Sequence, residues 1–186
     1  LHMGILSESF WRLARNIKTG DLDYVILKPV NTVFNIFFRY FRPSSLFYSF
    51  AVWGVLIYFG IQLDLSILSW ILLPILVLLG FTLLASLEFI VSSLMFYMIE
   101  GIGINFLRMQ IQNISRWPDF IFSPIPRKIF TLAIPALIIG SAPVKFLFDN
   151  NQWMLLVYLV LANLLSLLAL MYIWPRALSK YESASS

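Results

Sequence analysis

The sequence contains no cysteine and a single histidine, and these two absences exclude several classes of functional site. Without cysteine there is no disulfide, no thiolate nucleophile and no cysteine-based metal site. Because His2 is the only imidazole, the chain by itself cannot assemble a multi-histidine metal or haem site. The sequence also lacks a nucleophile–base pair and a glycine-rich phosphate loop followed by Lys and Ser or Thr. It therefore predicts no cofactor and no ATP binding of the Walker type.

Charge is scarce as well, and this scarcity sets the class of protein. Charged residues make up 12% and hydrophobic residues 60% of the 186 residues, and the mean hydropathy is +0.86. Soluble domains usually carry about 25% charged residues. Residues 1–186 are therefore predicted to form one membrane domain, an all-α, polytopic helical bundle in a lipid bilayer. The net charge of +4 does not indicate nucleic-acid binding, because Lys and Arg gather in short connecting stretches as the positive-inside rule expects.

Three uncharged runs predict transmembrane spans. The clearest covers residues 152–174, with Trp153 and Trp174 at its ends, where amphipathic rings prefer the headgroup level. A bilayer core about 30 Å thick needs about 20 helical residues, so this run is long enough. Residues 46–63 and 65–87 are two further runs, separated by Asp64.

The number of crossings follows from the two ends of the chain. Residues 1–43 contain six Lys or Arg against three acids, and we expect them and the tail, residues 175–186, to be cytoplasmic. The number of crossings is then even, and four are expected. The basic residues Arg108, Arg116, Arg127 and Lys128 favour 129–148 as the fourth, but its prolines favour a re-entrant segment there, with 88–115 crossing instead. The sequence leaves both candidates for the fourth crossing open.

An amphipathic helix is predicted over residues 5–18. Its apolar residues recur at spacings of three and four, and they are Leu6, Phe10, Leu13, Ala14 and Ile17. Gly20 fits a helix C-cap, and a second short helix is predicted to begin near Asn31 or Thr32. The first helix could lie in the membrane interface or pack on the bundle as a peripheral helix, and the two interpretations are compatible.

Two carboxylates, Glu88 and Glu100, flank apolar runs and are weak candidates for a transport pathway. Ionisable groups at membrane depth are costly and often functional. Both residues lie at the ends of runs, however, where headgroup water can reach them. Twelve positions separate them, so a continuous helix would place them roughly on one face.

Several stretches, in order along the chain, resemble bacterial ABC transporter permeases of the type-2 export class. The first is Ile17-Lys18-Thr19-Gly20-Asp21-Leu22-Asp23 with Leu27-Lys28-Pro29-Val30, and the second is Ser115-Arg116-Trp117-Pro118-Asp119-Phe120-Ile121-Phe122. The paired prolines Ile134-Pro135 and Ala142-Pro143 and the ending from Leu178 to Ser185 follow. The first stretch is similar to the basic–Gly–acidic–Leu–Asp and Leu–basic–Pro pattern of one subfamily.

This resemblance implies a transporter subunit in the bacterial inner membrane. A separate cytoplasmic ABC ATPase would drive this subunit. It implies a second permease subunit, identical or related, and no enzymatic activity of its own. It favours 88–115 as the fourth crossing and 129–148 as an outer re-entrant segment. Family members have six spans, so it also implies two spans before residue 1, with residues 1–5 ending the second.

The resemblance further assigns a role to residues 5–30. In the family, the amphipathic helix before the third span contacts the ATPase and transmits its motion. The residues expected to couple the chain to the ATPase are Arg12, Arg15, Lys18, Gly20, Asp21, Asp23, Lys28 and Pro29. A non-transporting membrane scaffold and, less favoured, a membrane-embedded lipid-modifying enzyme are the alternatives. No residue pattern identifies the transported substrate.

Overall fold

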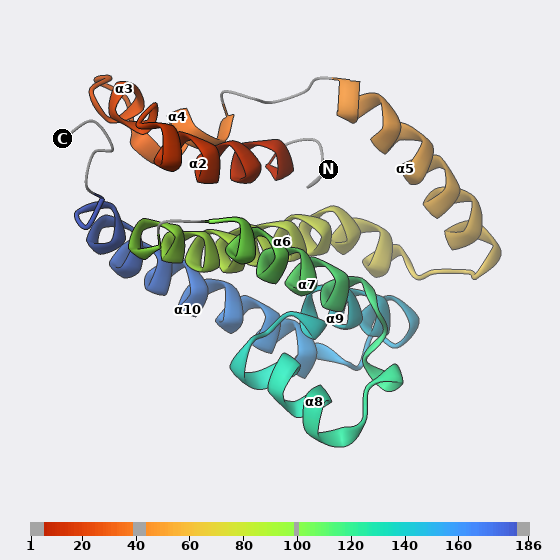
Figure 1. Ribbon diagram of the computed structural model, residues 1–186. Coiled ribbons are helices and arrows are strands. Elements are labelled where there is room, and N and C mark those ends of the chain that lie inside the picture. The colour runs from red at the N-terminus through yellow and green to blue at the C-terminus, as the bar shows by residue number, and fades with distance from the viewer. Residues whose placement is uncertain (1–5, 39–43, 99–100, 182–186) are drawn as a thin grey trace.

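The computed structural model describes residues 6–38, 44–98 and 101–181, and every regular element within those ranges is a helix (Figure 1). The predicted all-α bundle is therefore confirmed. The amino-terminal part holds α2 (Ser7–Thr19), α3 (Leu22–Ile26), α4 (Thr32–Phe38) and α5 (Ser44–Gln62). The rest contains α6 (Ile67–Ser92) with the 3₁₀ turn η1 (Ser93–Tyr97), α7 (Ile102–Arg116), η2 (Asp119–Ile121), α8 (Pro124–Lys128), the π-helical turn η3 (Ile129–Ala133), α9 (Leu137–Phe148) and α10 (Trp153–Leu178).

The centre of the bundle is the pair formed by α6 and α10. In the described part of the chain, two helices are long and apolar enough to cross a membrane on their own: Ile67–Tyr97 and Trp153–Leu178. The predicted spans 65–87 and 152–174 fall on these two helices. Their apolar length is what a bilayer core about 30 Å thick requires.

Hydrogen bonds between small polar side chains join α6 to α10. Thr82 Oγ1 donates to Asn163 Oδ1 at 2.7 Å, and one turn further Ser86 Oγ donates to Ser166 Oγ at 2.8 Å. In hydrocarbon, apolar burial supplies little force between helices, so such bonds and close packing hold them together. The two spans are therefore fixed in register along one seam.

The proline-marked segment at 129–148 is broken, as predicted. The helices Pro124–Ala133 and Leu137–Phe148 meet at a bend of 95°, and together they form either a broken span or a re-entrant loop. The π-helical turn η3 ends where Pro135 cannot continue the hydrogen-bond ladder. Beyond the bend, α9 packs against both α6 and α7.

The segment 88–115 is not one continuous helix. Residues 88–97 complete α6 and η1, whereas α7 begins at Ile102 and carries polar residues on its buried face. Within the described residues, α7 is not among the helices apolar enough to span alone. The identity of the fourth crossing, and the total of four, therefore remain predictions.

The first three helices form a layer on one side of the bundle (Figure 1). The predicted amphipathic helix is α2, and Gly20 caps it in the left-handed region, with φ 78°. Asn31 Oδ1 accepts the backbone N–H of Phe34 at 3.1 Å and so caps α4, near its predicted start. The apolar face of α2 packs on the bundle, where Phe10 and Leu13 are fully buried.

Aromatic contacts fix this first layer to the two central helices. The ring of Phe89 on α6 meets Phe10 of α2 at 5.3 Å and Trp174 of α10 at 5.8 Å, both edge to face. Trp174, expected at the headgroup level, is only 5% exposed because it fills this cluster. Edge-to-face pairs of this kind add about 0.5–1.5 kcal/mol each beyond burial.

The helix α5 stands apart from the other helices, at the right of Figure 1. It covers most of the predicted span 46–63, and residues Ser49–Gln62 within it form an apolar helix. At its far end, Gly60 is buried against the ring of Trp70 at the start of α6. That α5 crosses the membrane stays a prediction. Its helical structure and its lack of charged residues support this prediction.

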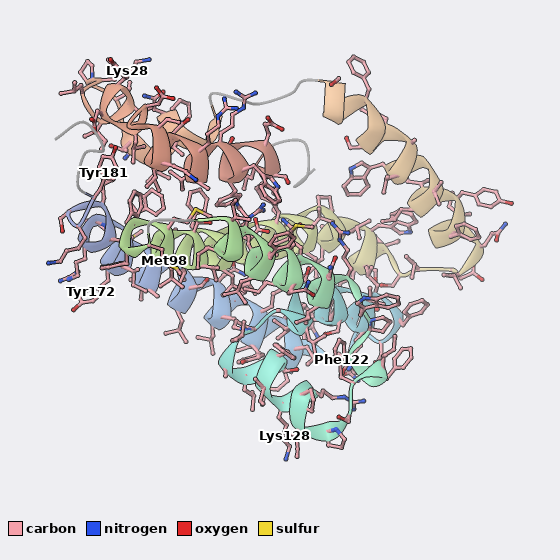
Figure 2. The ribbon with its side chains drawn as sticks, viewed as in Figure 1. Lys28, Met98, Phe122, Lys128, Tyr172 and Tyr181 are labelled. Carbon is pink, nitrogen blue, oxygen red and sulfur yellow. The ribbon has the colours of Figure 1, made fainter. Side chains whose placement is uncertain are left out.

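Figure 2 shows the two ends of the molecule. Lys28 lies in the layer of α2–α4, whereas Lys128 lies at the tip of α8 on the opposite side. Tyr181, just past α10, lies beside the first layer. The basic residues near 128 are therefore far from the predicted cytoplasmic segment.

Candidate functional site

A buried pair of opposite charges lies between α6 and α7. The side chains of Glu88 and Arg108 are both 0% exposed, and Arg108 Nη1 lies 3.5 Å from Glu88 Oε1. Gln112, one turn beyond Arg108, donates its amide to the same carboxylate oxygen. Buried ionic groups in a membrane domain are costly to maintain, so they point to a functional role. We name Glu88, Arg108, Gln112 and Asn105 the buried polar cluster.

The spacing of residues on α7 explains how the cluster forms. Asn105, Arg108 and Gln112 are three and four positions apart, and so they share one helical face. Asn105 Oδ1 accepts a hydrogen bond from Arg108 Nε at 3.3 Å, which orients the guanidinium toward α6. The buried face of α7 is therefore polar, although the apolar residues Ile104 and Ile111 flank it.

The helix α2 covers this cluster from the other side. The guanidinium carbon of Arg108 lies 4.6 Å from the centre of the Phe10 ring, which is the geometry of a cation–π contact. The same ring touches Phe89, the residue after Glu88. Any displacement of α2 on the bundle therefore changes the environment of the buried charges.

Several donors of the cluster have no hydrogen-bond acceptor among the described residues. They are Arg108 Nη1 and Nη2, Asn105 Nδ2 and the nearby Ser92 hydroxyl. In a low-dielectric interior, a partly satisfied polar network contributes less stability than an apolar core of the same size. These unpaired donors therefore lower the stability that the buried pair contributes.

The predicted coupling residues of α2 gather on its outer side. Arg12 pairs with Glu8 at 3.0 Å, while Arg15 and Lys18 are exposed. Arg15 and Lys18, together with Trp11 and Ala14, line a groove of about 250 Å³ against the start of α7. Asn105 of α7 lines the same groove. The groove thus connects the charged outer side of α2 to the buried polar cluster.

The remaining coupling residues follow α2 in the chain. Gly20 turns the backbone, Asp21 accepts a hydrogen bond from the Thr19 hydroxyl at 2.7 Å, and Asp23 lies on α3. Lys28 and Pro29 are exposed in the turn before α4. All eight predicted residues therefore lie on α2, on α3 or in the turns that follow these helices, in one layer.

Tyr181 brings the end of the chain to the same layer. Its ring lies 6.3 Å from that of Phe96 in η1. Burial raises the pKa of Tyr181 to about 12, and the Asp23 and Asp21 carboxylates add to this rise. The segment after α10 is therefore an additional contact of the predicted coupling layer.

The sequence analysis found part of this site. Glu88 was a weak pathway candidate expected within reach of headgroup water, but α6 continues past it and buries it completely. Glu100, the other candidate, lies outside the described residues. The sequence analysis did not identify Arg108, Asn105 and Gln112 as site residues, because polar residues indicated that this segment was a poor transmembrane span. Their spacing of three and four positions around an arginine, within an apolar chain, was the pattern that could have revealed them.

The cluster provides a buried charge pair and hydrogen-bonding groups. Among residues 6–38, 44–98 and 101–181, no three acidic or histidine side chains gather so that they could hold a metal ion. What the geometry does provide is a charge pair between two helices, covered by a third. Such an arrangement is suited to transmitting a shift of one helix to the others.

Comparison with known proteins identifies the family. No curated protein and no solved structure matches the chain. The family model described as "ABC-2 family transporter protein" matches residues 1–185, nearly the whole chain. With its membrane-length apolar helices, the chain therefore belongs to the ABC-2 family of transporter proteins and is a permease component located in a membrane.

Proposed function

We propose that the chain is the permease subunit of an exporter, driven by a separate cytoplasmic ABC ATPase that docks on the layer of α2–α4. Family membership supports a permease, and the lack of a phosphate-binding loop in the sequence supports ATP hydrolysis by a partner chain. The protein acts in the bacterial inner membrane as a multi-pass protein. A second permease, identical or related, completes the transport path.

One observation carries the role of α2. Its outer side presents Arg15 and Lys18, whereas its inner side places Phe10 on Arg108 of the buried polar cluster. A helix that contacts water on one face and a buried charge on the other can pass a movement inward. Because packed cores change between discrete arrangements, a small shift of α2 is sufficient to rearrange α6 and α7.

The first experiment is purification of the tagged protein from its native membranes in a mild detergent, with mass spectrometry of bound proteins. We expect a stoichiometric soluble ATPase with a Walker motif. The variant Asp21→Asn/Asp23→Asn/Lys28→Ala should lose it, since these charges lie on α3 and in the exposed turns on either side of it. The control Lys128→Ala/Asp149→Asn changes exposed charges away from that layer and should retain the ATPase.

The opposite results are equally informative. If the wild-type protein is folded and abundant but no ATPase accompanies it, the exporter proposal fails and a non-transporting scaffold is favoured. If the control variant loses the ATPase as fully as the triple variant does, the docking site is not the layer of α2–α4.

A further inference from the structure

A cavity of about 530 Å³ lies beside the central helices, and its lining does not include the members of the buried polar cluster. Its walls come from α6, α7, the π-helical turn η3 and α10. The lining is almost entirely apolar, with Leu87, Ile111, Ile134, Leu165 and Ala169 contributing from the four sides. Its volume falls within the usual range of ligand pockets, about 300–1,000 Å³.

The polar side chains of this lining restrict what the cavity can bind. Tyr158 donates its hydroxyl to the Thr131 carbonyl at 2.7 Å, and Ser166 Oγ donates to the Asn163 carbonyl at 3.0 Å. Both hydroxyls are therefore engaged within the chain. Gln110, the remaining polar lining residue, is on the exposed face of α7. A sugar or peptide would leave its polar groups unpaired here, whereas an alkyl chain would not.

The length of the cavity is close to that of an acyl chain in one leaflet of a bilayer. On α10 the lining runs from Tyr158 to Ala169, which is about 16 Å at the rise of an α-helix. The hydrocarbon core of a bilayer is about 30 Å thick, so an acyl chain in one leaflet occupies about half of that. Since α10 is one of the membrane-length helices, acyl chains are also the solvent around it.

We propose that this cavity binds an acyl chain of a membrane phospholipid, which enters sideways between α10 and η3. Tyr158 holds the η3 wall, because its hydroxyl contacts the Thr131 carbonyl and, at 3.3 Å, the Leu132 carbonyl. Single π-helical turns are frequent at functional sites. The inference requires the membrane location shown by the family and the apolar helices, and it goes beyond coupling to an ATPase.

The test uses the full chain in nanodiscs of phosphatidylcholine that carries a diazirine near the end of one acyl chain. After photolysis, mass spectrometry maps the labelled residues. We expect labels on η3 and on the cavity side of α10, in addition to labels on lipid-facing residues such as Leu164. Absence of labelling on η3 while Leu164 is labelled would overturn the proposal.

Matched variants separate the cavity from the general lipid surface. Ala169→Phe and Ala133→Phe each add a ring inside the cavity, whereas Leu168→Phe adds one at a neighbouring exposed position outside its lining. The two cavity variants should lower labelling of η3 several-fold and leave Leu164 labelling unchanged. Equal labelling of η3 in the wild type and both cavity variants, or an equal loss with Leu168→Phe, would overturn the proposal.

A second arm distinguishes the source of the alkyl chain. The same diazirine on a free fatty acid is added to unlabelled nanodiscs, and phospholipid is expected to label η3 more strongly. If the fatty acid alone labels η3, the phospholipid assignment is wrong. The measurement needs no ATPase, so a failure of co-purification and a failure of lipid labelling are separate results.

Discussion

Arg108 is a fully buried cation whose surroundings come from three helices. Its own helix supplies Asn105, α6 supplies Glu88, and α2 supplies the face of Phe10. A buried charge is tolerated when an opposite charge and oriented dipoles surround it, and its removal leaves the partner without compensation. The stability of the bundle should therefore depend more on the presence of both charges, Glu88 and Arg108, than on either residue alone.

A double-mutant cycle tests this balance. Arg108→Met leaves the Glu88 carboxylate buried without its ion-pair partner and should lower the free energy of unfolding by about 3–5 kcal/mol. The double variant Glu88→Leu/Arg108→Met removes both charges and should regain most of that loss. Unfolding in detergent, followed by circular dichroism, measures both. Additive losses in the double variant would show that the pair does not act as a unit.

Tyr181 offers a pH-dependent contact between the chain end and the first layer. Its pKa rises from 10.0 to about 12, mainly through burial, so the folded state holds the phenol proton more tightly than the unfolded state. The corresponding stabilisation is complete below pH 10 and is lost as pH rises toward about 12.

Titration of tyrosinate absorbance is the corresponding measurement. We expect a component with a pKa of about 12 in the wild type that is absent in Tyr181→Phe. The exposed Tyr172 provides a control, because Tyr172→Phe should retain this component. If Tyr181→Phe keeps the late component unchanged, the tail does not pack as described.

At the scale of elements, α9 is held by close backbone approaches. A Cβ on Gly140 would lie 2.7 Å from the Ser115 carbonyl oxygen of α7, and one on Gly80 of α6 would lie 3.2 Å from the Ile139 carbonyl oxygen. Small residues at helix contacts allow such approaches in membranes. The broken segment is therefore packed on two helices through these glycines.

Gly140→Ala should separate α9 from α7 and lower stability by about 1–3 kcal/mol, the usual effect of overpacking. Gly54→Ala is the matched control, because nothing lies within 4 Å of a Cβ at that position in α5. The control should be neutral or stabilising by up to about 1 kcal/mol, since alanine favours a helix over glycine. Thermal unfolding in detergent compares them, and equal effects of the two changes would contradict the close approach.

The helix α2 is the element expected to transmit motion, and Phe10 tests this separately from docking. Phe10→Leu keeps an apolar side chain but loses the cation–π contact with Arg108, worth about 0.5–2 kcal/mol. We expect the ATPase to remain bound while permease-dependent ATP hydrolysis in proteoliposomes falls several-fold. Trp11→Leu, which loses an aromatic contact with Phe106 instead, should change hydrolysis less. Unchanged hydrolysis in Phe10→Leu would argue against transmission through Arg108.

Elements with a strong local pattern were predictable from the sequence, and elements defined by their neighbours were not. The period of three and four and Gly20 predicted α2 with its cap, and uncharged length predicted α6 and α10. The spacing of Arg108 and Gln112 put them on one face of α7, but their burial depends on Glu88 and Phe10, which belong to other helices. Periodicity reports which residues share a face and does not report which partner covers it.

At the scale of the whole molecule, two lysines far apart in the sequence lie on opposite sides (Figure 2). Lys28 belongs to the first layer, whereas Lys128 lies at the tip of α8. Near α8, local structure engages two of the other basic residues: Arg127 Nε donates to the Asp119 carbonyl at 2.8 Å, and Lys145 pairs with the Asp119 carboxylate at 2.5 Å. These contacts fix both side chains to the segment around α8 and α9.

This arrangement leads to a prediction about membrane topology. Because the chain has no cysteine, single introduced cysteines can test it. Lys28→Cys, Lys128→Cys and Lys180→Cys each introduce a single thiol at an exposed position, with no background thiol. In spheroplasts, a membrane-impermeant maleimide should label Lys128→Cys at once but label the other two only after permeabilisation. That result would place α8 outside, make 129–148 re-entrant and require 88–115 to complete the even number of crossings. If Lys128→Cys instead requires permeabilisation like Lys28→Cys, then 129–148 is the fourth crossing, because residue 128 and the tail would both be cytoplasmic.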